Sequence, residues 1–381
     1  MKIKIIASTK VSYELPKEEA LDFSGKSAGI CYLPDTLEKL FNEPNEKTKN
    51  RVNGNIKSGH HSVFGHPTYS LSLEGIPKIL AMILNNEKIY NTSEKSARYT
   101  KMEPSIQEKE LYEKWIKIYE KQILSEYPNF EEKRVKKLAQ ENARYLISVF
   151  TPATVMEYTT NFCQLNYIIN WAKDYIEKEE NNSFSIKLKN VFEEFLKSMP
   201  DIEVEGLDTT VKKRSFSLFS KREHRTEEFG ENYCTTYLVS FAELAQAQRH
   251  RTINYEMTLL KEPKYYVPPI IRNTEYEKEW IKDISSLKDF YPQGMLVKVN
   301  ERGTIENFAL KCTERLCGCA QLEIMEQTEQ TMHKYIEAVK ENKELYEYLL
   351  PYSKGARCTF PGWKCTAPCI FGGKNAMNRK I

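Results

Sequence analysis

Residues 233–251 read YCTTYLVSFAELAQAQRHR and join a strand-like run to an alanine-rich segment with a cationic end. Residues 233–239 are mostly β-branched and aromatic, which favours a strand, and residues 240–247 are strong helix formers. The cationic end is Gln248-Arg249-His250-Arg251. Such a cluster is costly to bury without anions, and Arg side chains bind phosphate and other planar acceptors. A solvated helix end is the alternative, because positive charge is favourable at a helix C-terminus.

The rest of the chain also alternates between strand-like and helix-like segments. In the first half we predict a strand within residues 1–8 and another at 69–73, and helices at 77–86, 107–125, 129–150 and 156–198. In the second half we predict a helix at 275–287, a strand at 295–300 and mostly helix over 305–349. The shared order is a weak sign of an internal repeat, and residues 199–214, which lack apolar periodicity, are the predicted linker. We expect an α+β fold, with α and β mixed, of two lobes that each pack a small sheet on long helices.

Composition argues against several classes of protein. The 381 residues carry a formal net charge of +3, with 29% charged residues and a mean hydropathy of −0.59. No apolar run approaches the ~20 residues needed to cross a bilayer, and the nearly balanced charge gives no general signal for nucleic acid. The first residues lack the small-residue cleavage site of a signal peptide. We therefore expect a soluble, cytoplasmic protein that binds neither nucleic acid nor membrane.

Two further clusters carry polar groups that could face a ligand. Glu94-Lys95-Ser96-Ala97-Arg98-Tyr99 places a carboxylate, a hydroxyl and a guanidinium at alternating positions, so one face of an extended segment could present all three. An exposed polar loop explains this pattern equally well. The other cluster runs from Asn300-Glu301-Arg302 through Asn307-Phe308 to Arg315. It is ambiguous by itself.

Taken together, these clusters resemble the flavin-dependent thymidylate synthases. That family carries R-H-R followed closely by N-E-x-S-x-R-Y, after an H-x-S-x-x-E-H turn. The first half of the chain resembles the turn at residues 60–66 and the S-x-R-Y segment at residues 93–99. It has Asn86-Glu87-Lys88 where R-H-R should stand. The second half keeps R-H-R at residues 249–251 and lacks the segment that should follow it.

The losses in the two halves are complementary, which favours a fusion of two copies with divided roles. We predict a first copy at residues 1–205 with the nucleotide-binding face, a second copy at 206–350 with the flavin-binding face, and a Cys-rich tail at 351–381. Because the family is a homotetramer with active sites between subunits, the resemblance implies that this chain forms a homodimer, which is a pseudo-tetramer of copies.

The resemblance implies FAD-dependent C5 methylation of dUMP to dTMP, with methylene-tetrahydrofolate and NADPH as co-substrates. The catalytic candidates are Arg249, between flavin and nucleotide, and Arg98 and Ser96 on the nucleotide. The expected FAD contacts are His60, Ser62, Arg249, His250, Arg251, Asn300, Arg302 and Asn307. The expected nucleotide contacts, whose Arg side chains would neutralise phosphate and polarise the pyrimidine carbonyls, are Glu94, Ser96, Arg98, Tyr99, Arg144, Gln248 and Arg315.

The cysteines offer a separate hypothesis. Cys358, Cys365 and Cys369 lie in the Gly/Pro-rich tail, and Cys317 and Cys319 follow Arg315. Four thiolates, those of Cys317 and the three tail cysteines with Cys319 as an alternative member, could hold zinc and order the tail. An iron–sulfur cluster is also compatible, and independent reduced thiols are the simpler alternative.

Two other functions fit the sequence. One is a related flavin-dependent one-carbon or reductive modification of another uracil-like nucleotide, because a duplicated enzyme is free to diverge. The other is a non-catalytic protein that binds flavin or nucleotide.

Overall fold

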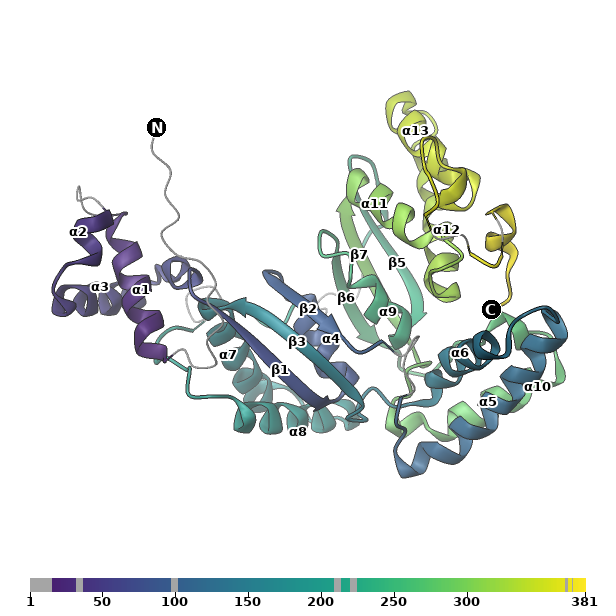
Figure 1. Ribbon diagram of the computed structural model, residues 1–381, viewed down its shortest axis with the longest axis horizontal. Coiled ribbons are helices and arrows are strands. Elements are labelled where there is room, and N and C mark those ends of the chain that lie inside the picture. Colours follow the sequence, from purple (N-terminus) through teal and green to yellow (C-terminus); the bar gives the residue numbers. More distant parts are fainter. Residues whose placement is uncertain are drawn as a thin grey trace. The chain divides into compact units, whose positions relative to one another are not determined.

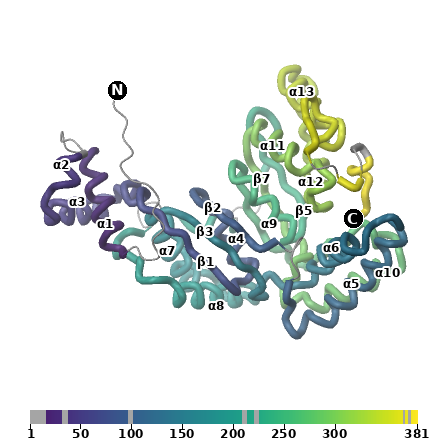
Figure 2. Tube along the Cα trace, in the orientation of Figure 1, coloured from purple at the N-terminus to yellow at the C-terminus, as the bar shows by residue number. Residues whose placement is uncertain are grey.

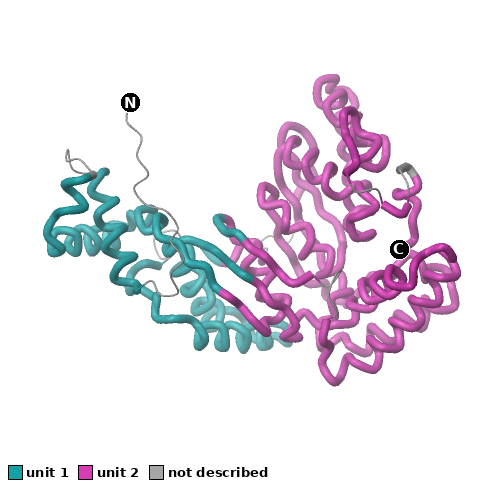
Figure 3. The backbone as a smooth tube through the Cα atoms, in the orientation of Figure 1, with its two compact units in different colours: residues 1–71, 89–91, 157–215 teal, residues 72–88, 92–156, 216–381 magenta. Residues whose placement is uncertain are grey.

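The computed structural model describes residues 16–31, 37–96, 102–208, 214–219, 225–366, 369–371 and 373–381 (Figure 1). The chain divides into two compact units (Figure 3). Unit 1 comprises residues 1–71, 89–91 and 157–215, and unit 2 comprises residues 72–88, 92–156 and 216–381. Helices and strands alternate along the chain, which confirms the predicted mixed α and β class.

Helices dominate unit 1. Its helix α1 packs closely on α3, and a Cβ added to Gly25 of α1 would lie 2.6 Å from the Val52 side chain. Glycine therefore permits this approach. The helical elements of unit 1 are α1 (Lys17–Gly29), α2 (Leu37–Phe41), α3 (Asn45–Ser58), the 3-10 turn η1 (His61–Gly65), α7 (Phe162–Lys178) and α8 (Ser183–Ser198).

The first sheet has three strands in the order β1-β3-β2. They are β1 (Thr68–Ile76), β2 (Tyr90–Glu94) and β3 (Thr154–Asn161), and each contributes residues to both units. The central strand β3 corrects the prediction of continuous helix over 156–198. Its side chains alternate between buried and more exposed positions, as a strand requires. The helix begins only at Phe162, where the Asn161 side chain accepts a hydrogen bond from the Gln164 N–H at 2.8 Å.

The second sheet lies in unit 2 and has four antiparallel strands in the order β4-β5-β7-β6. They are β4 (Glu228–Phe229), β5 (Asn232–Ser240), β6 (Asn254–Leu259) and β7 (Leu296–Thr304). β5 confirms the strand predicted at 233–239, and β7 extends the one predicted at 295–300. β6 has no counterpart among the predicted strands.

The two sheets share one topology. When the short edge strand β4 is set aside, the last strand in chain order lies in the middle of each sheet, as β1-β3-β2 and β5-β7-β6. β1 and β5 both contain nine residues, and each leads into a helix, α4 (Lys78–Asn86) or α9 (Phe241–Ala247). A hydrogen bond also recurs at the start of these helices: Ile79 N–H donates to the Val149 carbonyl at 2.9 Å, and Ala242 N–H donates to the Gln293 carbonyl at 3.1 Å. The predicted repeat would explain this common order.

A layer of helices beside the second sheet holds a large apolar core of unit 2. The blue α5 (Ile106–Glu126) and α6 (Glu132–Ala143) lie beside the green α10 (Glu275–Ser286), far away in the sequence (Figures 1 and 2). At the centre of this core the Trp115 and Trp280 rings meet edge to face with centroids 4.8 Å apart. The helix predicted over 129–150 ends at Ala143, because the following residues pair with the chain near Pro292.

The C-terminal part of unit 2 is helical, as predicted, but broken. Its helices are α11 (Ile305–Arg315), α12 (Leu322–Ala338) and α13 (Lys343–Leu349). Beyond them the described residues form only short 3-10 turns. The 3-10 turns of unit 2 are η2 (Arg144–Leu146), η3 (Pro269–Ile271), η4 (Lys288–Phe290), η5 (Leu350–Lys354), η6 (Arg357–Thr359) and η7 (Gly373–Asn378). Of the helices described, none has the length and apolar character that a membrane crossing requires. The strand predicted within residues 1–8 lies outside the described residues.

Candidate active site

A cavity of about 220 Å³ in unit 2 gathers side chains from both halves of the chain. Five cationic side chains and one carboxylate line it, so it suits an anion. Its first-half residues are Lys78, Glu94, Lys95, Ser96, Met102, Arg144 and Thr154. Its second-half residues are Ala242, Ala245, Gln246, Arg249, Gln293 and Arg315. Five predicted site residues, Glu94, Ser96, Arg144, Arg249 and Arg315, therefore meet in one chain.

The carboxylate of this cavity is held by helix α4. Glu94 is the last residue of β2, and its Oε1 accepts a hydrogen bond from Lys78 Nζ at 2.6 Å. Asn85 Nδ2 donates to the other oxygen at 3.3 Å. Lys78 and Asn85 stand at the two ends of α4, so the helix presents both groups to one carboxylate. The ion pair balances the one negative charge, and the lining stays positive overall.

Arg144 is the most buried cation of the cavity. Its side chain is nearly inaccessible, at 6% exposure, and its Nη2 donates to Gln321 Oε1 at 2.5 Å. Its Nε is buried without a hydrogen-bond partner among the described residues. A buried guanidinium normally has its donors satisfied, so this position has spare capacity for an anionic or carbonyl-bearing ligand. Gln321 also accepts from Gln246 and donates to Tyr145, which fixes its orientation.

His250 holds the half-buried Arg315 in place. Arg315 Nε donates to His250 Nε2 at 2.7 Å, so the imidazole accepts through this nitrogen and is neutral. Burial, and then the charges of Arg315 and Lys311, lower the pKa of His250 to about 2. The middle residue of the R-H-R motif therefore orients the Arg315 guanidinium at the cavity wall, where it reaches from the last residue of α11.

Helix α9 explains how the R-H-R segment reaches this place. Ser240 caps the helix, with its Oγ accepting from the Glu243 N–H at 3.1 Å. Beyond the helix, Gln248 Nε2 donates to Asn86 Oδ1 and to the Met82 carbonyl, both at 2.9 Å. Gln248 is thus buried against α4 and is not among the residues that line the cavity. It anchors the turn from which the exposed Arg249 side chain reaches the cavity.

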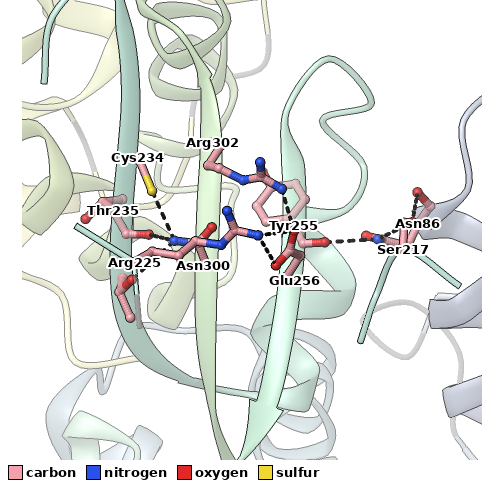
Figure 4. A network of polar contacts seen from close by, with 10 residues as sticks. Asn86, Ser217, Arg225, Cys234, Thr235, Tyr255, Glu256, Asn300 and Arg302 are labelled. Carbon is pink, nitrogen blue, oxygen red and sulfur yellow. Dashed lines mark hydrogen bonds and ion pairs between the residues drawn. The ribbon is translucent and has the colours of Figure 1, made fainter. Parts of the chain in front are cut away.

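Other predicted flavin residues lie elsewhere in the second sheet (Figure 4). Asn300 is buried on β7 and donates to Cys234 Sγ at 3.2 Å and to the Thr235 carbonyl at 3.3 Å. Arg302 donates to Glu256 at 2.5 Å. Asn307 lies on α11, and Arg251 is exposed at the end of the motif. The residues that line the cavity do not include any of these four.

The remaining predicted contacts are His60, Ser62, Arg98 and Tyr99. His60 and Ser62 belong to unit 1, where His60 is half-buried and Ser62 is exposed. The neighbouring His61 is buried, and its Nδ1 lies 2.9 Å from the Tyr167 hydroxyl. Arg98 and Tyr99 lie outside the described residues.

The predicted metal site is not formed by the described side chains. Among them no group of three or more His, Cys, Asp or Glu residues is placed to hold a metal ion. Cys317 is buried and lies near Cys319 and Cys369, but Cys358 and Cys365 are exposed. The side chains of Cys317, Cys358, Cys365 and Cys369 do not form such a group among the described residues, and Cys369 lies beside Gly318 at the end of α11. Cys319 and Cys369 instead line a separate cavity of about 400 Å³.

The prediction also missed several lining residues. Lys78 follows Pro77 in the first turn of α4 and carried no motif. Gln246 could have been found from periodicity, since Ala242, Ala245, Gln246 and Arg249 follow the i, i+3, i+4, i+7 spacing of one helix face.

Comparison with known proteins identifies a family in the first part of the chain. A family described as thymidylate synthase complementing protein, Thy1, matches residues 11–200. No curated protein matches the chain. The match covers Lys78, Glu94, Ser96 and Arg144, whereas Arg249 and Arg315 follow it in the sequence. On this match, which includes the first-half wall of the cationic cavity, the chain belongs to the Thy1 family of thymidylate synthase complementing proteins.

Proposed function

We propose that the protein is an FAD-dependent enzyme that methylates carbon 5 of dUMP with methylene-tetrahydrofolate and NADPH. The observation that carries this proposal is the cationic cavity in a chain of the Thy1 family. A nucleotide monophosphate brings a doubly charged phosphate and two ring carbonyls, and guanidinium groups bind both. When bound, reduced FAD supplies the hydride, and the protein supplies orientation and electrostatics.

The cavity fits the nucleotide through three cations with different surroundings. Arg144 is buried and has a free Nε, so it can donate to a ligand without breaking an existing bond. Arg315 is oriented by the neutral His250. Arg249 is exposed and reaches the cavity from the R-H-R turn. We assign Arg144 and Arg315 to the phosphate and ring carbonyls, with Ser96 as a hydroxyl donor to the phosphate, and Arg249 to the border between nucleotide and flavin.

The division of roles between two copies is part of the proposal. The cavity wall combines the segment that follows β2 in the first half with the segment that follows α9 and precedes β6 in the second half. A fusion of two copies, at residues 1–205 and 206–350, explains why nucleotide residues come from one and R-H-R from the other. Two such chains would form the pseudo-tetramer that the family's assembly implies.

Two activity tests separate this function from its alternatives. Purified protein should take up FAD and turn yellow; protein that remains colourless with excess FAD contradicts both enzymatic functions. Tritium release from 5-labelled dUMP, with NADPH and methylene-tetrahydrofolate, distinguishes methylation of dUMP from a reaction on another uracil-like nucleotide. UMP and free uridine serve as the comparison substrates.

Paired variants test the assignment of residues. Arg249→Ala should abolish FAD binding, whereas Arg98→Ala should keep FAD and lose dUMP, because the two residues belong to the flavin and nucleotide faces. Isothermal titration with each ligand measures both affinities. Normal dUMP binding by Arg98→Ala would contradict the divided site.

A further inference from the structure

We propose that each chain has a single working site, because its own residues 216–219 occupy the position of the second. The inference rests on the proposed function and on the two-copy architecture. A fused pair of copies has two equivalent positions, one between the first copy's nucleotide segment and the second copy's R-H-R turn, and one with the roles exchanged. The first position is the cationic cavity, and the second can be found by aligning the two sheets.

The strands align without a gap, although α4 begins at Lys78, one residue later in this register than α9, which begins at Phe241. β1 and β5 have equal lengths, and their alignment brings the first residues of β2 and β6 together, Tyr90 with Asn254. In this register the R-H-R motif at Arg249, His250 and Arg251 corresponds to Asn85, Asn86 and Glu87. Alignment of the helix starts, Lys78 with Phe241, instead places the motif at Asn86, Glu87 and Lys88, as the sequence predicts. In both registers Arg249 corresponds to an amide.

The exchanged position has lost the charges of an anion site on both sides. On the α4 side, two arginines correspond to an amide and a carboxylate, Asn85 and Glu87. On the side of the nucleotide segment, Glu94, Ser96 and Arg98 correspond to Thr258, Leu260 and Glu262. An acidic residue thus replaces the phosphate-binding Arg, and a carboxylate repels an anionic ligand. Arg144 and Lys288 each begin the 3-10 turn that precedes the equivalent carbonyls of Val149 and Gln293, and Lys288 is exposed to solvent.

Residues 216–219 fill the space beside these changed residues. Ser217 N–H donates to Glu87 Oε1 at 2.8 Å, and Ser217 Oγ accepts from Asn86 Nδ2 at 2.8 Å. Leu218 is fully buried, and its carbonyl accepts from Met257 N–H on β6 at 2.7 Å. The segment therefore lies along the outer edge of β6 and covers the end of α4. The residues equivalent to His250 and Arg251 bind this segment and cannot face a flavin.

The neighbouring arginines of the same face are neutralised within the protein (Figure 4). Glu256 of β6 accepts from Arg225 Nη2 at 2.6 Å and from Arg302 Nη2 at 2.5 Å. Asn86 Nδ2 also donates to the Tyr255 carbonyl at 3.0 Å, so the end of α4 binds both the segment and the strand. Two guanidinium groups that could have attracted a phosphate are thereby held by one carboxylate.

Titration of the full-length chain with FAD tests this inference, with the number of bound molecules per chain as the readout. We expect one FAD per chain, measured by isothermal titration and by absorbance of the protein after gel filtration. The matched variants are Arg251→Glu and Ser217→Ala, one on each side of the alignment. Arg251→Glu should lose FAD, whereas Ser217→Ala should keep one FAD per chain, with an affinity changed by less than about three-fold. Circular dichroism confirms that each variant is folded.

The outcomes separate the inference from the proposed function. Two FAD molecules per chain, or a halved stoichiometry in Ser217→Ala, would overturn the single-site inference and leave the function intact. No uptake of FAD by the folded wild-type protein would remove the proposed function, and the inference with it. If the binding of one FAD per chain survives in Arg251→Glu but is lost in Ser217→Ala, the working site lies at the exchanged position. That result would also overturn the inference.

Discussion

Glu243 is expected to make the stability of the protein depend strongly on pH. It lies in the first turn of α9, is fully buried, and neither carboxyl oxygen has a hydrogen-bond partner among the described residues. Burial raises the pKa of Glu243 from its ordinary value of 4.5 to about 8, against the opposing charge of Lys311. Lys311 gives little relief because it already donates to Glu301 at 2.7 Å and to Gln327 at 2.8 Å.

The sign and size of the effect follow from proton linkage. Between pH 4.5 and 8 the folded protein keeps the Glu243 proton that the unfolded chain releases, so the contribution of Glu243 to stability is greatest below pH 4.5 and falls as the pH rises towards 8. Each unit of pKa difference corresponds to about 1.4 kcal/mol. Glu243→Gln has nearly the same shape and no charge to bury. We expect it to raise the free energy of unfolding by about 2–4 kcal/mol at pH 8 and by less than about 1 kcal/mol at pH 5.

Urea unfolding, followed by tryptophan fluorescence at pH 5 and pH 8, measures this difference. Glu323→Gln is the matched control, because Glu323 is equally buried but accepts hydrogen bonds from Ser240 N–H at 2.8 Å, from Ser240 Oγ at 2.6 Å and from Tyr145 Oη at 2.9 Å. Its substitution should destabilise the protein by about 1–3 kcal/mol, since Gln offers these three donors one acceptor oxygen instead of two. If Glu243→Gln and the wild type lose stability equally between pH 5 and pH 8, the reasoning about Glu243 is wrong.

Three further predictions concern the site and the core. His250→Asn should remove a contribution that destabilises the wild type by about 1.4 kcal/mol for each pH unit below 6.5, because burial keeps this His neutral while the unfolded chain binds a proton. This contribution opposes that of Glu243, so it is measured as the difference between variant and wild type in urea unfolding at pH 6.5 and 5. Arg144→Lys should weaken dUMP binding by about ten-fold or more and leave FAD binding intact, since Lys cannot both reach Gln321 and present a second planar donor. Isothermal titration with both ligands distinguishes this result from a general loss of structure. Trp280→Ala should cost about 3–5 kcal/mol in the free energy of unfolding, and an unchanged urea midpoint would show that the Trp115 contact is not part of the core.

Local signals in the sequence determined much of the fold. The strand at 233–239 and the helix at 240–247 were predictable because β-branched residues gave way to helix formers at Ser240, which caps the helix. The helices at 107–125 and 275–287 followed from their amphipathic periodicity and agree closely with α5 and α10. The sequence also predicted five of the residues that line the cavity, because each belongs to a motif or a polar cluster: Glu94, Ser96, Arg144, Arg249 and Arg315.

Tertiary pairing decided the elements that local signals described wrongly. Residues 156–161 were predicted as the start of a helix, but residues 154–161 form the central strand of the first sheet. Neighbouring strands on both sides satisfy the hydrogen-bonding groups of its backbone. The helix expected up to residue 150 stops at Ala143, because Val149 N–H donates to the Tyr291 carbonyl at 2.9 Å. Such partners lie far away in the sequence, so periodicity within one segment cannot reveal them.

The chemistry of the site shows the same limit. The sequence by itself determined which cationic side chains this protein carries and that the losses in its two halves are complementary. Only the tertiary structure decided that Arg144 and Arg249 meet in one cavity, that Arg302 is held by Glu256, and that the tail cysteines do not converge. The physical reason is that a side chain acts through its partners and its burial, and both depend on residues that folding brings from distant parts of the chain.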